Sequence, residues 1–313
     1  MRVFVAGATG VAGKEAVRHF VSAGHAVTGV ARSAEKASLL ERFGARPVAV
    51  DLFEATAVKR VISRHEAVVN VTTHIPPFNR AAIPGSWREN DDIRHEVSRN
   101  LVDAALAAGA TRYVQESIAF AYEDRGDEWI EEDTPLDLVP LTESLAVAED
   151  QAARMTAAGA TGIVLRFGQF YAPHASHTIG LVKTARRGIF PLPGRPEEYV
   201  PTIHHEDIGS AVVAALAAPA GAYNVVDDDP LTKRALSDVL ARSVGRERLH
   251  HLPASARELG PSGRLYVRSN RSSNRRFRAV TSWRPRYPSA RDGMPVVVDE
   301  MTRQATADGA AND

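Results

Sequence analysis

Short apolar runs alternate with amphipathic segments through the first half of the chain. In the segment 14–23, Val17, Phe20 and Val21 share one helical face, and Gly24 then supplies a left-handed stop. The spacing also predicts a helix at 93–107. The apolar runs predict buried strands at 3–6, 26–31, 47–50, 67–71, 112–115 and 162–167. Strands that are apolar throughout and alternate with helices are typical of a parallel sheet covered by helices on both faces.

The second half of the chain is less regular. It predicts helices at 178–187, 206–217 and 232–243, a strand at 222–226, and a frayed end from Thr302 onward. We therefore expect an α/β fold: a doubly wound, Rossmann-type parallel sheet with a smaller C-terminal substrate lobe. The expected boundaries are 1–171 with 198–226 for the sheet domain, and 172–197 with 227–313 for the lobe.

The turn after the first strand carries the strongest chemical signal. Gly7 permits the tight turn, Gly10 lets the backbone approach a pyrophosphate, and Gly13 lets the following helix pack closely on the strand. The helix start offers free N–H groups and a partial positive charge to that pyrophosphate. We therefore expect a nicotinamide dinucleotide here, bound by Gly7, Thr9, Gly10, Val11, Ala12 and Gly13.

The end of the second strand bears on which dinucleotide is bound. An acidic residue there would bind a ribose 2′-hydroxyl, but the chain has Ala31 and Arg32. Because an arginine can pair with a 2′-phosphate, we expect NADP (as NADPH), with NAD as the alternative. Arg32 could instead be an ordinary solvated residue at a helix start.

Several motifs resemble those of the extended short-chain dehydrogenase/reductase family, the NAD-dependent epimerase/dehydratase-like group. They are the G-x-x-G-x-x-G spacing and residues 51–52, 70–73, 166–173, 203–208, 221–225 and 283–288. The resemblance implies that Asp51 and Leu52 lie at the adenine and that Asn70 and Thr72 lie beside a cofactor ribose. It also implies that Asp207 ties the two halves of the molecule together.

The catalytic pattern of that family is not retained. The family uses a serine, which hydrogen-bonds the substrate, and a Tyr-x-x-x-Lys pair, which moves the proton and holds the nicotinamide ribose. In the alignment Ser117 falls on the serine, whereas Leu141 and Leu145 replace the tyrosine and the lysine. A leucine can neither donate a proton nor bind a ribose hydroxyl, and no Tyr-x-x-x-Lys occurs elsewhere in the chain.

Other polar residues are candidates for the chemistry. The alignment places these near the nicotinamide: Thr72, His74, Arg94, Glu116, Ser117, Tyr122, Glu143, Gln169 and His174. From them we predict catalytic roles for Ser117 as a donor to a substrate oxygen, and for Tyr122 or Glu116 as proton carriers. The alternatives are a turn-capping serine, a packed tyrosine and a solvated or arginine-paired glutamate.

Composition narrows the classes of function. Among 313 residues, 44% are hydrophobic and 24% charged, and the formal net charge is zero, so nothing favours nucleic acid or an anionic membrane. The absence of cysteine excludes disulfides, a thiolate nucleophile and a cysteine-ligated zinc site. Histidines 74, 174, 177, 204 and 205 have no carboxylate in a ligand pattern, so we expect no metal. The arginine-rich stretch 264–291 is interpreted as a solvated or anion-binding face of the lobe.

Together these patterns predict a cytoplasmic NAD(P)H-dependent oxidoreductase acting on a small molecule by a non-standard proton route. Reduction of a carbonyl, an enone, a quinone or an imine fits. Because the first strand begins at once, we expect no signal peptide. The alternatives are a non-catalytic NADP sensor, or a lyase, cyclase or isomerase on the same scaffold. The resemblance implies a homodimer through 93–107 and 142–157.

Overall fold

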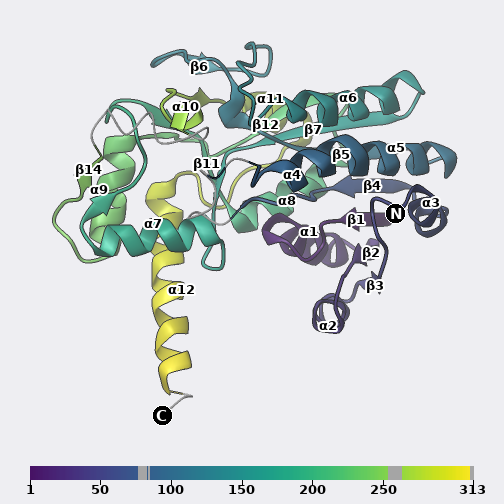
Figure 1. Cartoon of the computed structure of the whole chain (residues 1–313), viewed down its shortest axis with the longest axis horizontal. Helices are drawn as coiled ribbons and strands as arrows, with labels where there is room; N and C mark the ends of the chain where they lie inside the picture. Colours follow the sequence, from purple (N-terminus) through teal and green to yellow (C-terminus); the bar gives the residue numbers. More distant parts are fainter. Residues whose placement is uncertain (77–82, 84, 253–262, 311–313) are drawn as a thin grey trace.

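Seven parallel strands form the central sheet of the computed structural model, which describes residues 1–76, 83, 85–252 and 263–310 (Figure 1). The strand order is β12-β7-β5-β4-β1-β2-β3, so the chain reverses direction across the sheet between β1 and β4. The strands are β1 (Arg2–Ala6), β2 (Ala26–Val30), β3 (Arg46–Val48), β4 (Ala67–Asn70), β5 (Arg112–Ile118), β7 (Thr161–Phe167) and β12 (Gly221–Val225). The predicted Rossmann-type sheet is confirmed.

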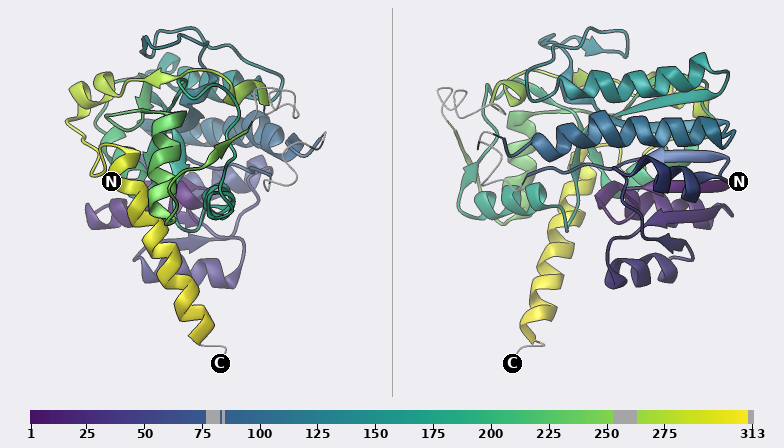
Figure 2. Two further views of the ribbon diagram at one scale, coloured as in Figure 1. Left: turned by 90° about the vertical axis from the view of Figure 1, so that its left-hand side faces the viewer. Right: turned by 45° about the vertical axis from the view of Figure 1, so that its right-hand side comes forward.

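Helices cover both faces of the sheet (Figures 1 and 2). Alternate residues of β1 point to opposite faces: Val3 and Val5 into one core, Phe4 and Ala6 into the other. The first core is closed by α1 (Val11–Ser22), α2 (Ala34–Arg42) and α8 (His205–Ala215), and the second by α3 (Ala55–Ile62), α5 (Ser98–Ala107) and α6 (Ser144–Ala157). Both cores are apolar, which is why these strands show unbroken apolar runs instead of alternation.

The connection between β4 and α5 is irregular. A short helix α4 (Arg88–Asp92) leads into one turn of π-helix, η1 (Ile93–Val97), and then into α5. The helix predicted at 93–107 therefore exists, but its first five residues are wound more widely than an α-helix. Such π turns are rare and are frequent at functional sites.

The C-terminal lobe has a core of its own. It packs α7 (Ser176–Arg186), α9 (Lys233–Ser243) and α12 (Ala290–Ala310) around Phe190 and Leu240. Short strand pairs lie outside the central sheet: β8 (Gln169–Tyr171) with β11 (Thr202–His204), β9 (Ile189–Phe190) with β14 (His250–His251), β10 (Tyr199–Val200) with β13 (Leu231–Thr232), and β6 (Trp129–Ile130) with β15 (Arg271–Ser272). Of these, β10–β13 and β6–β15 join the expected sheet domain to the lobe. The short helices η2 (Ala119–Ala121), α10 (Gly263–Tyr266) and α11 (Arg275–Thr281) complete the fold.

The prediction of a frayed end from Thr302 onward is wrong. Helix α12 runs on to Ala310 and projects beyond the lobe (Figure 1). Its first half is anchored because Met294, Val297 and Val298 are buried in the lobe core. The Thr302 hydroxyl donates to the carbonyl of Val298 at 2.9 Å, and the Arg186 guanidinium donates to that hydroxyl at 3.0 Å, so the helix continues past its buried part.

The start of α8 joins the two halves. The Asp207 carboxylate accepts the backbone N–H groups of Arg286 at 2.6 Å and Tyr287 at 3.0 Å, which confirms its expected linking role. The neighbouring His204 is 1% exposed, lies against the Tyr287 ring with 3.9 Å between ring centroids, and accepts the Glu206 N–H at Nδ1. Burial, together with the charges of His205 and Arg286, lowers the pKa of His204 to about 3.

This buried imidazole predicts a pH-dependent stability. Below its ordinary pKa of 6.5 the unfolded chain binds a proton that the folded His204 cannot take up, so stability is lost as the pH falls from 6.5 towards 3. The His204→Asn variant keeps a capping acceptor but does not titrate. Between pH 7 and pH 5 it should lose about 2 kcal/mol less of its unfolding free energy than the wild type does. Urea unfolding at both pH values measures this, and equal losses in the two proteins would contradict it.

Candidate cofactor and active site

The turn between β1 and α1 is shaped by its glycines. Gly7 has φ +78°, and a Cβ there would lie 2.6 Å from the carbonyl oxygen of Val71. A Cβ on Gly13 would lie 2.0 Å from the carbonyl oxygen of Gly7. Both positions must be glycine for the fold itself. Gly10 differs, because it caps the start of α1, is exposed, and has only the Gly7 oxygen near its Cβ position, at 3.3 Å.

These contacts make the turn a cradle with open N–H groups. The first turn of α1 lies directly over the end of β1, and Gly10 presents bare backbone to the outside. Thr9 and Val11 are half-buried beside it, and Ala12 is buried in the first turn of α1. A pyrophosphate fits this geometry, because helix N-termini bind anions through their unpaired N–H groups.

The other predicted cofactor residues lie on both sides of the cradle. Arg32 is exposed directly after β2. Asp51 is exposed, and its Oδ1 accepts the Phe53 N–H at 3.0 Å, which shapes the loop after β3. The Leu52 carbonyl accepts the side-chain amide of Asn100 at 3.0 Å.

Asn70 and Thr72 lie at the end of β4. Asn70 is buried, donates to Oε1 of Gln115 at 3.1 Å, and accepts the backbone N–H of Thr72 at 3.2 Å. The side chain of Asn70 thus orders the strand end, while Thr72 lies next to the cradle: a Cβ on Gly7 would be 2.8 Å from its nitrogen.

Two of the predicted catalytic residues are part of one buried network. The Ser117 hydroxyl donates to Oε1 of Glu149 at 2.6 Å, and Arg166 grips the same carboxylate through Nε at 2.9 Å and Nη2 at 2.6 Å. Arg166 also donates to the Tyr122 hydroxyl at 2.8 Å, which in turn donates to Asn224 at 2.7 Å. Burial raises the pKa of Tyr122 to about 12. The hydroxyls of Ser117 and Tyr122 thus both donate to partners within the protein. Their catalytic roles stay predictions.

The third predicted catalytic residue, Glu116, is buried near Arg94. Burial raises the pKa of its carboxyl, and the Arg94 charge opposes that rise. Arg94, on η1, is 5% exposed and donates to the Ser144 hydroxyl at 3.4 Å. Asn90, which is fully buried, is not among the predicted site residues. The sequence contains a signal for it, because Asn90, Arg94 and Ser98 follow the i, i+4, i+8 spacing of one buried helix face.

The surroundings of Leu141 are apolar. Leu141 packs with Val139 and Leu265, and Phe120 borders the same cluster. Phe120 and Leu265 also line a small cavity of about 20 Å³ between the sheet edge and the lobe, where the Phe120 and Tyr266 rings stack with centroids 6.1 Å apart. Leu145 is fully buried. The surroundings of these two positions are therefore hydrocarbon.

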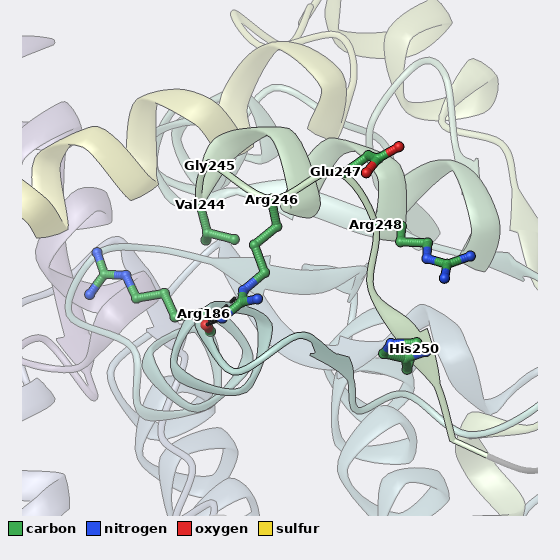
Figure 3. A pocket seen from close by; sticks show the side chains of 7 residues that line it. All are labelled: Arg186, Val244, Gly245, Arg246, Glu247, Arg248 and His250. Atoms are coloured by element: carbon green, nitrogen blue, oxygen red, sulfur yellow. Dashed lines mark hydrogen bonds between the residues drawn. The ribbon is translucent and has the colours of Figure 1, made fainter.

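A separate hollow of about 510 Å³ lies on the outside of the lobe (Figure 3). Arg246 donates to the carbonyl oxygen of Arg186, whereas the side chains of Arg186 and Arg248 point in different directions. The lining groups do not converge on one point, as a binding site requires. Within the described ranges no cluster of three or more metal-ligating side chains occurs, and no described helix is long and apolar enough to cross a membrane.

The cradle predicts different effects for two of its glycines. Gly13→Ala should destabilise the fold, because its Cβ would overlap the Gly7 carbonyl. Gly10→Ala should fold normally but weaken NAD(P)H binding by about tenfold, since the methyl group faces the expected pyrophosphate. Thermal unfolding and nucleotide titration by fluorescence measure the two effects. Unchanged affinity in a folded Gly10→Ala protein would rule out a pyrophosphate at this turn.

The ion pair behind Ser117 predicts a large loss of stability. Glu149 and Arg166 have side chains that are 14% and 9% exposed, so Glu149→Gln should cost about 3–5 kcal/mol by leaving a buried guanidinium unpaired. The matched control is Asp103→Asn, which breaks the Arg154–Asp103 pair, 45% and 38% exposed, and should cost less than about 1 kcal/mol. Urea unfolding of both variants measures the difference, and similar costs would refute the structural role of the buried pair.

Comparisons with known proteins agree with this geometry. 3-Diazoavenalumate denitrifying reductase from a Streptomyces species is 33% identical over 308 residues, covering 94% of this chain and 99% of that protein. UDP-glucose 4-epimerase from Thermus thermophilus, solved with NAD, has a TM-score of 0.77 at 22% identity and covers 96% of this chain and 99% of its own. A human epimerase family protein, solved with NADPH, has a TM-score of 0.75 at 18% identity, with the same 96% and 99% coverage.

The family assignment rests on a match to a family profile. The profile of a family described as NAD(P)H-binding matches residues 7–219, from the first glycine of the cradle to the segment after α8. The two solved structures show the same fold with a C-terminal lobe, as the resemblance implied. The chain therefore belongs to the NAD(P)H-binding family and has the fold of the extended short-chain dehydrogenases/reductases.

Proposed function

We propose that this protein is an NADPH-dependent reductase that delivers hydride to an electron-poor acceptor needing no proton from the enzyme. The observation that carries the proposal is the apolar wall at Leu141, the position that the resemblance assigns to the proton-donating tyrosine. The nearby hydroxyls of Ser117 and Tyr122 already have partners inside the protein. A reaction that produces an alkoxide would lack an acid here.

A cationic acceptor removes that requirement. The bound nicotinamide supplies a hydride, and this charge neutralises a cation without leaving an oxyanion to protonate. Val139, Leu141 and Leu265 would exclude water from the reacting atoms, which protects a reactive acceptor from hydrolysis.

The name of the Streptomyces relative suggests such an acceptor, a diazo compound that also carries a carboxylate. We extend this class to the present chain as an aromatic diazonium carboxylate. Hydride adds to the terminal nitrogen and gives a neutral diazene. The carbon–nitrogen bond then breaks, N2 leaves, and the transferred hydrogen ends on carbon, so no proton from the protein enters the balance. The stacked rings of Phe120 and Tyr266 support an aromatic substrate.

Arg32 supports NADPH over NADH. Its side chain is exposed at the end of β2, and within the described part of the chain it forms no ion pair with a carboxylate. A 2′-phosphate at this edge would therefore meet a guanidinium without competition.

The test is reduction of a diazotised aminobenzoate by the purified protein with NADPH, and a matched benzaldehyde as the comparison acceptor. We expect one N2 released for each NADPH oxidised, deuterium from 4-deuterated NADPH on the carbon that lost nitrogen, and far slower aldehyde reduction. The same mixture without the protein gives the uncatalysed background. Tight NADPH binding without turnover on either acceptor would instead support a non-catalytic sensor.

A tyrosine variant tests the proton route itself. Tyr122→Phe should leave kcat for the diazonium within about threefold, because no acid is needed, whereas loss of a general acid costs about a hundredfold or more. The hydroxyl also bonds Arg166 and Asn224, so the same variant should unfold at lower urea concentration. A hundredfold loss of kcat in a folded Tyr122→Phe protein would return Tyr122 to the role of proton carrier.

A further inference from the structure

Three buried polar atoms lie along the edge of the sheet beyond the cradle without a hydrogen-bond partner in the described part of the chain. They are Oγ1 of Thr72, Nδ2 of Asn90 and Nε of Arg94. A buried polar group left unpaired costs free energy, so such atoms call for an explanation. Because several occur in one place, a missing ligand explains them better than separate defects do.

The three side chains form a row that starts at the cradle. Thr72 lies beside Gly7, as the 2.8 Å from a Gly7 Cβ to its nitrogen shows. Two residues further on, the His74 N–H donates to Oδ1 of Asn90 at 3.0 Å, and Arg94 follows one turn later on η1. The row thus runs from β1 across β4 towards β5, whereas Arg32 follows β2 on the other side of β1. The strand order reverses between β1 and β4, and a dinucleotide in this fold lies across that point. Its second nucleoside therefore lies over the β4–β5 half of the sheet.

Arg94 is held where its unpaired nitrogen has little freedom. Its buried side chain, on the π turn, donates to the Ser144 hydroxyl at 3.4 Å, and that hydroxyl donates to Asp91 at 2.7 Å. Ser144 immediately precedes Leu145, the position that the resemblance assigns to the ribose-binding lysine. The buried Arg94 guanidinium therefore contacts the residue next to Leu145, where the family has its lysine.

The charges around Arg94 favour a neutral ligand. The carboxylates of Glu116 and Asp91 both act on its guanidinium, and Glu149, also near, is neutralised by Arg166. An anionic ligand would meet more negative than positive charge. A vicinal diol would find donors in Arg94 and Asn90 and an acceptor in Glu116, which is the set that two neighbouring hydroxyls need.

We propose that Arg94, with Asn90 and Glu116, binds the hydroxyls of the cofactor's second ribose, the one that carries the nicotinamide. This inference deepens the proposed function, because it concerns the same cofactor site. Arg94 supplies the charge-assisted hydrogen bond that a lysine at position 145 would have supplied. The chain thereby retains cofactor positioning without the Tyr-x-x-x-Lys pair.

Three probes of increasing length test this by calorimetry. ADP has the adenosine and both phosphates, ADP-ribose adds the second ribose, and NADPH adds the nicotinamide together with the 2′-phosphate at the adenosine end. In Arg94→Met the affinity for ADP should stay within about twofold, whereas those for ADP-ribose and NADPH should fall about tenfold to a hundredfold. The matched control is Arg99→Met, an exposed arginine on the next turn of α5, which should leave all three affinities unchanged.

Other outcomes overturn the proposal. Equal losses for ADP and ADP-ribose would make Arg94 a structural residue, and an unchanged NADPH affinity with a raised KM for the acceptor would make it a substrate ligand. If Arg94→Met does not fold, Glu116→Gln replaces it, with the same selective loss for ADP-ribose expected and its absence counting against the proposal. Calorimetry measures binding without turnover, so the test of Arg94 stays valid even if the reductase assay shows no reaction.

Discussion

A buried charge is tolerated only with a partner, and the carboxyl edge of this sheet holds four such charges close together. Glu116, Glu149, Arg94 and Arg166 all lie largely out of water. Taking each ion out of water costs several kcal/mol unless hydrogen bonds replace the lost hydration. How each of the four is paired therefore decides which parts of the edge are fixed scaffold and which can receive a ligand.

Glu149 and Arg166 pair with each other, and Ser117, Tyr122 and the Glu132 carbonyl complete their hydrogen bonds. Their two-pronged contact joins α6 to β7, and it binds Ser117 and Tyr122 into the same network. These two hydroxyls, for which the sequence predicts catalytic roles, have their hydrogen-bond partners within this network. Leu141, by contrast, lies in an apolar cluster. These two observations are the reason that we propose an acceptor that takes hydride without a proton.

Arg94 and Glu116 are satisfied only in part. The guanidinium retains an unpaired Nε, and the neighbouring Asn90 retains an unpaired amide nitrogen, within the residues that the structure describes. The two regions thus differ in how they are paired: the first network is closed by its own hydrogen-bond partners, whereas Arg94 and Asn90 in the second keep unpaired nitrogens. The cradle at Gly7 lies at the near end of this second region, where we have proposed that the cofactor supplies the missing partners.

The sequence by itself determined the sheet, the glycine turn and the family, because these depend on local pattern. Strands buried on both faces must be apolar throughout, and Gly7 and Gly13 are required wherever a helix packs this closely on a turn. Tertiary structure alone decided the partners of Ser117 and Tyr122, since Glu149, Arg166 and Asn224 are brought to them from distant segments. It alone also decided the partners of Arg94, since Ser144 and Glu116 are brought to it from distant segments. The extension of α12 depends likewise on the lobe core that anchors its first half, which no local signal near Thr302 reveals.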